Sequence, residues 1–346
     1  MKSKKAVYFL LSLLVFPLLA FAHPQEEDQD LFSKDDAAFL MTGEYLYWTA
    51  HEGALDYAIR MRAAAWGPSD SFAQGDVERA EFKWENGYRF AIGYYRAPNF
   101  WEADFQWTYI HFEGNNRAKR PPANENRFIT GTFPQIFPAP MDHATSHIYM
   151  HYKLADLIAH RIFHPFDNPH LRIKLLGGMT GVWLHQGWNI RYFDAQLNNT
   201  KIQNQWKFWG FGFRAGLSFD WFWGDDFYAT GKMSTGLAVG HYQNHSKQET
   251  SVILQPGDHP NIPIRDLYYD DYRISYTAQF LLGPSYQKSF DTWRIELFVG
   301  YEMTIWSNLQ EIFRSTRAPA DQAKETWLSI GLVSLHGLTT RATINF

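Results

Sequence analysis

Apolar and polar residues alternate one by one along much of this chain. In FGFRAGLSFDWFW, residues 211–223, Phe211, Phe213 and Trp221 share one parity, whereas Arg214 shares the other with Asp220. Successive side chains of a β-strand point to opposite faces, so this period of two predicts strands with one apolar and one charged face. Two arrangements fit such strands: a soluble sheet whose apolar face is the core, or a membrane barrel whose apolar face meets lipid.

The same alternation predicts about ten strands along the chain. They cover roughly 38–49, 84–96, 100–112, 147–163, 171–186, 211–223, 227–240, 272–287, 293–306 and 338–346. Within the fourth of them the apolar positions change parity, because Ile148 and Leu154 differ in parity from Leu157. A β-bulge near Ala155 or a short helix would explain this change.

Short and long connections alternate between these strands. The short ones are 97–99, 164–170, 224–226 and 288–291, and the long ones are roughly 51–82, 113–146, 187–206, 242–270 and 307–328. An up-and-down barrel has this pattern, with short periplasmic turns, long extracellular loops and both termini on the periplasmic side. An extra hairpin hidden in 51–82 or 113–146 would raise the number of strands to twelve or more.

Strand length and charge placement favour the membrane barrel over the sandwich. Several alternating runs reach twelve residues, whereas globular strands are usually near 5–6. A charged side chain facing lipid at the midplane costs roughly 2–4 kcal/mol, so the charged parity is expected to line the lumen. The lumen-lining candidates are Arg89, Asp104, Arg172, Lys174, Arg214, Asp220, Lys232, Arg273, Arg294, Glu296, Glu302 and Arg341.

Aromatic residues make up 18% of the chain, with 14 Trp, 19 Tyr and 28 Phe. Trp and Tyr concentrate where a membrane meets water, because each combines an apolar ring with a polar group. The candidates for such aromatic girdles are Trp107, Tyr109, Trp183, Trp221, Trp223 and Trp306. A mean hydropathy of -0.38 does not exclude a barrel, because only alternate residues of its strands face lipid.

Both ends of the sequence carry signals for export. Residues 1–22 have three lysines, an apolar stretch and Ala20-Phe21-Ala22, which together predict a signal peptide cleaved after Ala22. An acidic segment, 23–37, and a barrel, 38–346, are expected to follow. The last residue, Phe346, closes an alternating strand, as in the signal that the outer-membrane barrel-assembly machinery recognises. We therefore expect the protein in the outer membrane of a Gram-negative bacterium, in contact with its lipid.

Composition excludes several kinds of chemistry. The chain has no Cys, so it has no disulfide, thiol nucleophile or thiolate metal site. A net charge of -4 gives no basic bias for nucleic acid. His147, His151, His160 and His164 cluster in sequence, but histidines near the membrane interfaces explain them, and we expect no metal or cofactor. A hydrolytic site would need residues such as His111, Asp142 and His143 brought together at the extracellular rim. We expect no enzyme.

Seven stretches span almost the whole mature chain in order: GEYLYWTAHEGALDYA, WENGYRFAIGYY, WEADFQWTYIHF, HYKLADLIAHRIF, FWGFGFRAGLSFDW, LLGPSYQ and LHGLTTRATINF. Together they resemble the Legionella-type major outer membrane protein family, which also occurs in Chlamydia-like bacteria. The resemblance implies a pore-forming outer membrane protein without catalytic residues. Because this sequence has no Cys, the cysteine cross-linking of related proteins is not carried over.

Two functions stay open at this point. The first is a porin, in which small hydrophilic solutes diffuse passively past the lumenal charges, and which is a major surface component. The second is a non-conducting adhesin or structural protein that acts through its extracellular loops. Its physical basis is size, since barrels of about eight strands are filled by side chains and clear channels need 16–18. Solute preference, homo-oligomer formation and loop partners are not determined by the sequence.

Overall fold

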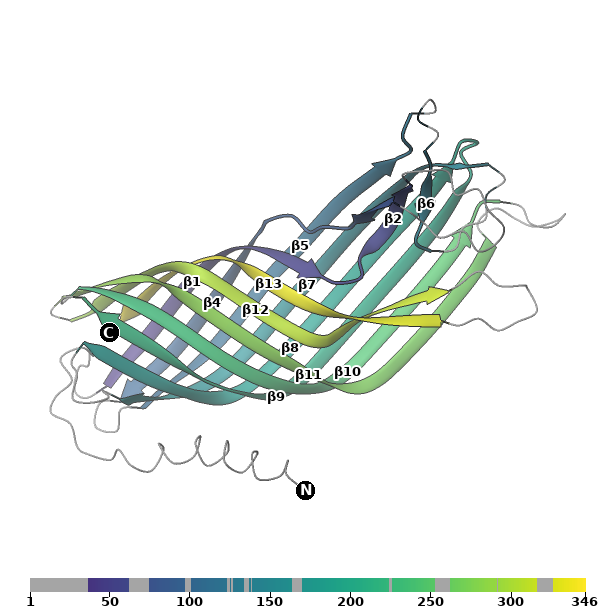
Figure 1. Ribbon diagram of the computed structural model, residues 1–346. Helices are drawn as coiled ribbons and strands as arrows, with labels where there is room; N and C mark the ends of the chain where they lie inside the picture. The colour runs from purple at the N-terminus through teal and green to yellow at the C-terminus, as the bar shows by residue number, and fades with distance from the viewer. Residues whose placement is uncertain are drawn as a thin grey trace, which may run out of the picture. The chain divides into compact units, whose positions relative to one another are not determined.

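The computed structural model describes residues 37–61, 75–96, 101–122, 125, 127–133, 137, 139–163, 170–223, 226–252, 262–290, 292–315 and 326–346. Ten long strands form one closed antiparallel ring in the order β1-β13-β12-β11-β10-β9-β8-β7-β5-β4 (Figure 1). Their bounds are β1 (Ala37–Glu52), β4 (Glu85–Arg96), β5 (Trp101–Lys119), β7 (Met141–Phe163), β8 (Leu171–Asp194), β9 (Asn199–Phe222), β10 (Phe227–Thr250), β11 (Ile262–Ser289), β12 (Arg294–Ser315) and β13 (Thr326–Asn345). The predicted ten-stranded up-and-down barrel is confirmed.

The ring closes where the first and last strands meet. β1 pairs with β13 on one side and with β4 on the other. Phe39 donates its backbone N–H to the carbonyl of Phe346 at 2.8 Å, and Phe346 donates back to Phe39 at 3.0 Å. Their rings stack with centroids 6.3 Å apart. Closure pairs the two strands that would otherwise be exposed edges.

The outer face of the ring is apolar between two aromatic levels. The lower aromatic ring, which lies at strand ends beside the short turns, consists of Trp101, Trp221, Phe227 and Phe346. The upper aromatic ring consists of Tyr47, Trp84, Trp183 and Trp209; Tyr47 stacks on Trp84 at 5.4 Å, and Trp183 is opposite Trp209 in the register. Exposed Phe211, Phe213 and Val239 lie between the two levels. This belt is the membrane-spanning part of the barrel.

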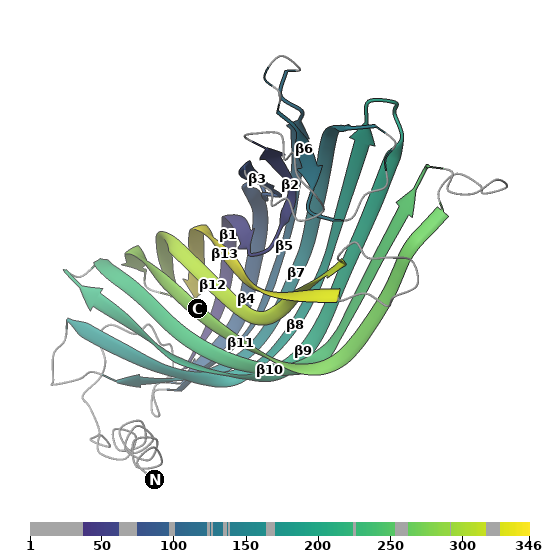
Figure 2. The same ribbon diagram turned by 45° about the vertical axis from the view of Figure 1, so that its right-hand side comes forward.

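One side of the wall continues far beyond the upper aromatic ring. β8, β9 and β10 have 24 residues each and β11 has 28, whereas a spanning strand needs about 9–11. The expected loops 187–206 and 242–270 are therefore largely strand, and these boundaries need correction. β8 and β9 are joined by residues 195–198 alone, where Leu197 adopts a left-handed φ of 65°. Figure 2 shows this taller part of the wall around β7 to β11.

A second, small sheet lies within the segments expected to be long loops. β2 (Asp56–Met61), β3 (Gly75–Arg79) and β6 (Ile129–Gly131) form it in the order β3-β2-β6. These strands do not join the barrel, so the extra strands do not enlarge the ring. Among the described residues, no helix is long and apolar enough to cross a membrane.

The change of parity in the sequence predicts a β-bulge or a short helix near Ala155, but β7 has neither. The strand is continuous, and its described register shifts only between Met141 and His143. Ile148 and Leu154 face inward, on the same side as Asp156 and His160, whereas Leu157 faces outward. The error came from assuming a polar inner face along the whole strand. The inner face is apolar in its extracellular half.

Candidate functional site in the barrel lumen

All twelve lumen-lining candidates have their side chains on the inner face of the ring. Most are buried, with Arg172, Arg214 and Arg294 only 2% exposed. Such burial is possible because both signs of charge are present and pair with each other. The remaining nine share the inward parity of their strands: Arg89, Asp104, Lys174, Asp220, Lys232, Arg273, Glu296, Glu302 and Arg341.

A chain of charged and polar contacts, here called the central network, crosses the lumen at mid-height. It runs Glu44–Arg89 (2.6 Å), Arg89–Glu302 (2.9 Å), Glu302–Gln279 (2.5 Å), Gln279–Arg214 (2.9 Å) and Arg214–Asp156 (3.2 Å). These residues come from six strands, β1, β4, β12, β11, β9 and β7. The network therefore occupies the middle of the barrel and connects its opposite walls.

Trp306 and Tyr152 meet beside the central network. The indole Nε1 of Trp306 donates a hydrogen bond to the hydroxyl oxygen of Tyr152 at 3.1 Å. Trp306 is on β12 and Tyr152 on β7, which are five strands apart in either direction around the ring. Both side chains are buried, at 0% and 1% exposure. Two large aromatic side chains from diametrically opposite walls thus touch across the lumen.

Above this contact the lumen holds an apolar core that includes the small sheet. The Tyr192 hydroxyl donates to the Tyr57 carbonyl at 2.7 Å, which ties β8 to β2. Phe133, just after β6, packs edge-on against Trp188 with centroids 5.8 Å apart. The Arg265 guanidinium of β11 lies 5.9 Å from the same Phe133 ring. The segment around Phe133 therefore bridges β8 and β11 inside the extracellular opening.

Glu52 belongs to this upper layer, five residues beyond Tyr47 and so outside the membrane-spanning belt. Gln186 donates to Glu52 Oε2 at 2.7 Å from a strand four places away around the ring. Burial raises the pKa of the Glu52 carboxyl to about 8, and the Gln186 hydrogen bond offsets part of this rise. Burial also raises the pKa of Tyr57 in β2 to about 12. Glu52 is thus protonated near neutral pH.

The periplasmic half of the lumen is lined by ion pairs. Arg172 contacts Asp220 at 2.8 Å, and Lys174 contacts Glu102 at 2.8 Å. The carboxylates of Glu102 and Asp104 and a ring nitrogen of His160 lie within 4.8 Å of one another, which is close enough to hold a metal ion. Lys174 already supplies a positive charge to Glu102, and Asp104 contacts His160 at 2.6 Å. Lys174 and His160 thus already contact the two carboxylates of this cluster.

The structure corrects one of the aromatic girdle candidates. Trp107, Tyr109, Trp183, Trp221 and Trp223 lie on the outer face near the two membrane levels. Trp306 does not, because its parity on β12 is that of Glu302 and its ring is buried in the lumen. The residue was assigned from its position at a strand end, although its parity already indicated the inner face.

The hydrolytic candidates are not brought together. Asp142 and His143 contact each other at 2.8 Å as sequence neighbours near the outer end of β7. His111 instead stacks on His151, eight residues further down β7, with centroids 4.3 Å apart. The predicted signal peptide, its cleavage at Ala22 and most of the acidic segment lie outside the described residues, as does His164.

Sequence reasoning missed the residues that fill the upper lumen. The alternation places Tyr152 on the apolar face of the predicted strand 147–163 and Leu184 within the predicted strand 171–186, whereas Trp188 and Trp206 fall in the predicted loop 187–206; the structure has all four on the inner face. The available signal was the alternation on either side of the short connection 195–198, where Trp188, Ile190 and Ile202 keep the parity of the inner face. The outward side chains that alternate with these residues are polar, which indicates that this part of the barrel wall is surrounded by water.

A closed ring of long antiparallel strands with an apolar, aromatic-bordered outer face defines an outer-membrane β-barrel protein. A family model described as Legionella pneumophila major outer membrane protein precursor matches residues 33–333. The chain belongs to this family, and its place is the outer membrane. The family resemblance found in the sequence is confirmed.

Solved structures give distant matches. The outer membrane protease OmpT from Escherichia coli is 10% identical with a TM-score of 0.42, covering 92% of this chain and 99% of that chain. The toluene transporter TodX of P. putida is 8% identical with a TM-score of 0.27, covering 93% and 92%. A Pseudomonas aeruginosa FadL homologue is 8% identical with a TM-score of 0.20, covering 90% of each. Similarity at this level carries no argument about activity. Comparison with curated proteins gives no match.

Proposed function

We propose that this protein is a resident barrel of the outer membrane that does not conduct solutes passively, and that it acts through the wall it extends outside the membrane. The observation that carries the proposal is the hydrogen bond between Trp306 and Tyr152, which joins opposite sides of the lumen. The central network and the apolar core above it support the same conclusion. A ten-stranded ring is also close to the size that side chains fill.

A second candidate is a porin-like pore for passive diffusion of small hydrophilic solutes. The charged inner face of the periplasmic half favours it, since Arg172, Asp220 and Lys174 would attract or repel solutes by charge. In this candidate the Trp306 and Tyr152 side chains separate to open the lumen. Neither candidate assigns a catalytic residue, and we expect no enzymatic activity.

Single-channel recording separates the two candidates. The full chain is refolded in detergent and inserted into a planar bilayer, with insertion checked by recovery of heat-modifiable protein from the membrane. We expect no unitary current steps from the native sequence. Reproducible steps from the native sequence, with ion selectivity altered by Arg172→Ala, would overturn the closed barrel and support the pore.

The role of the extracellular wall has its own test. Removal of residues 189–203 and connection of Trp188 to Asn204 by a two-residue turn shortens β8 and β9 in register. The membrane-spanning part is unchanged, so the variant is expected to fold and show heat-modifiable mobility. We expect loss of the binding of intact cells to host surfaces. Retention of that binding by a folded, surface-exposed variant would argue against a role for this wall.

A further inference from the structure

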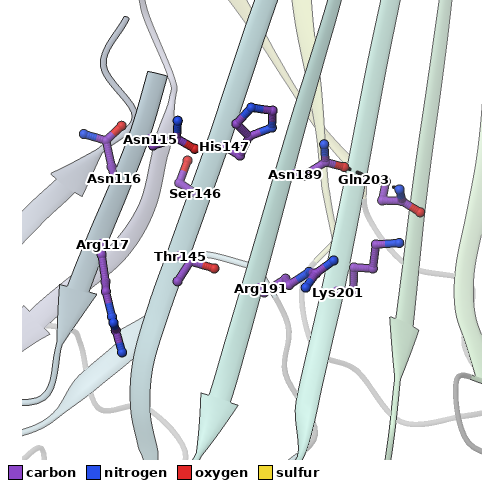
Figure 3. Close-up of a pocket in the computed structure, with 10 residues that line it drawn as sticks. All are labelled: Asn115, Asn116, Arg117, Thr145, Ser146, His147, Asn189, Arg191, Lys201 and Gln203. Carbon is purple, nitrogen blue, oxygen red and sulfur yellow. Dashed lines mark hydrogen bonds between the residues drawn. The ribbon is translucent and has the colours of Figure 1, made fainter. Parts of the chain in front are cut away.

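A groove of about 570 Å³ lies on the outer face of β5, β7, β8 and β9, on the extracellular side of the upper aromatic ring. We call it the extracellular groove, and its lining includes Arg117, Thr145, Asn189, Arg191 and Lys201 (Figure 3). Residues 117, 145, 191 and 201 share the outward parity of Trp107, Trp183 and Trp209. The groove therefore continues the surface that faces lipid lower down.

The strand register places basic side chains of this groove side by side. Arg117 is opposite Thr145, Thr145 is opposite Arg191, and Arg191 is opposite Lys201. In Figure 3 the side chains of Arg191 and Lys201 lie next to each other. Like charges directly opposite on neighbouring strands are destabilising. An anion bound between them would remove this repulsion.

Among the described residues, the Arg and Lys side chains of the groove have no acidic partner of their own, and several acids nearby contact other groups. In the described part of the chain, no ion pair or side-chain hydrogen bond is found for Arg117, Arg191 or Lys201. The acids on this face contact other groups: Glu113–His147 at 3.1 Å, Asp142–His143 at 2.8 Å, Lys247–Glu249 at 2.5 Å, His245–Asp266 at 2.7 Å and His241–Asp270 at 3.4 Å. The side chains of Arg117, Arg191 and Lys201 are thus left for a ligand from outside the chain.

A lower basic level lies between the groove and the membrane. Lys153 is opposite Trp183, at the level of the upper aromatic ring, and Lys207 is opposite His185, two residues above that ring. His151 stacks with His185 beside them, with centroids 6.0 Å apart. Polar and basic side chains therefore lead from the edge of the hydrocarbon to the groove without interruption by an apolar patch.

The distance between the groove and the membrane selects the kind of ligand. Arg191 is eight residues beyond Trp183, or about 26 Å along the strand. With a strand tilt of 35–45°, this is about 20 Å above the upper aromatic ring. The polar layer of a phospholipid leaflet is only about 5–8 Å thick. A phospholipid headgroup therefore reaches Lys153 and Lys207, but not Arg191.

We propose that this face binds a phosphorylated glycolipid of the outer leaflet. Its acyl chains lie against the apolar belt, its membrane-proximal phosphates contact Lys153 and Lys207, and anionic groups of its sugar chain occupy the extracellular groove. The guanidinium groups of Arg117 and Arg191 suit phosphate because they can donate two parallel hydrogen bonds. The proposal requires only that the barrel lies in the outer membrane. It does not depend on whether the lumen conducts.

Binding of rough-type lipopolysaccharide to the refolded full chain in zwitterionic detergent tests the proposal. The test variant is Arg117→Ala/Arg191→Ala/Lys201→Ala. The charge-matched control is Arg96→Ala/Arg161→Ala/Lys288→Ala, which removes three basic side chains near the periplasmic end. Heat-modifiable mobility verifies that each variant is folded. We expect the test variant to bind at least about tenfold more weakly and the control to bind like the native sequence.

Competition identifies the source of the anionic group. We expect phosphatidylglycerol and inorganic phosphate to compete poorly, because neither combines acyl chains with a long anionic sugar chain. Equal binding by the test variant and the native sequence would overturn the proposal. Equal competition by phosphatidylglycerol or by inorganic phosphate would overturn it as well, by showing a general anion surface. The conductance result of the native barrel is unaffected by any of these outcomes.

Discussion

Trp306 donates a hydrogen bond to Tyr152 across the full width of the lumen, between strands that are five places apart in the ring. In barrels of this size, inward side chains reach the axis and meet those of the opposite wall. The contact therefore places two buried aromatic side chains across the lumen. β7 and β12 share no backbone hydrogen bonds, because they are not neighbours in the ring. The side-chain contact therefore links two strands that the ladder does not join.

Replacement of Trp306 by Ala should destabilise the barrel strongly. The substitution removes a fully buried indole and leaves a cavity between β12 and β7, with an expected loss of about 3–5 kcal/mol in the free energy of unfolding. Urea unfolding in lipid vesicles, followed by tryptophan fluorescence, measures this loss. The matched control is Trp183→Ala on the lipid face, which should cost distinctly less. Equal losses for the two variants would contradict a packing role for Trp306.

Arg89 should be essential to the central network. It contacts Glu44 at 2.6 Å and Glu302 at 2.9 Å, and both acids are at most 7% exposed at the side chain. Arg89→Met leaves two buried carboxylates without their cation, which should lower the unfolding free energy by about 3–5 kcal/mol. The further changes Glu44→Gln and Glu302→Gln should restore much of the loss. Failure of this rescue would show that packing, not charge, determines the effect.

An exposed ion pair provides the comparison for that experiment. Arg60 and Glu78 of the small sheet are 2.7 Å apart, but Arg60 is 46% exposed at the side chain. Water screens such a pair, so Arg60→Ala should change the free energy of unfolding by about 0–1 kcal/mol. A loss as large as that of Arg89→Met would mean that the small sheet depends on this pair.

The period of two was sufficient to predict the ring, the strand order and the inward face of residues such as Arg89, Arg214 and Glu302. Backbone pairing in a barrel follows directly from alternation and short turns, so these features are local in the sequence. Trp306 could have been assigned correctly from its parity. The apolar inner face at Ile148 and Leu154 could not, because nothing local shows that the opposite wall and the small sheet cover it.

The height of the wall was also missed for a physical reason. A strand above the membrane has polar residues such as Asn189 and Gln203 outside and apolar residues such as Trp188 and Ile202 inside. This is the reverse of the pattern within the belt, where the outer face is apolar. A search for apolar outward positions therefore ends each strand at the upper aromatic ring. The basic groove was overlooked because it lies in the segments assigned to loops.

Glu52 should make the stability of the barrel depend on pH. The folded-state pKa is about 8 and the ordinary value is 4.5, so the folded protein holds a proton that the unfolded chain loses between these values. Its stabilising contribution is complete below about pH 4.5 and is lost as the pH rises through about 8. Glu52→Gln should flatten the decline of the unfolding midpoint between about pH 5 and about pH 9. An unchanged pH profile would show that Glu52 is ionised in the folded protein.

Phe346 should matter more for assembly in the cell than for stability of the finished barrel. Its backbone N–H and carbonyl close the ring with Phe39, and Phe346→Ala keeps both groups. The ring is 48% exposed, so its loss should cost only about 1 kcal/mol in vitro. If the assembly machinery recognises this aromatic side chain, the amount of folded protein in outer membranes should fall several-fold, whereas refolding in detergent remains efficient. Comparison of heat-modifiable protein from cells and from refolding reactions measures both effects, and a parallel loss in the two would assign Phe346 a purely structural role.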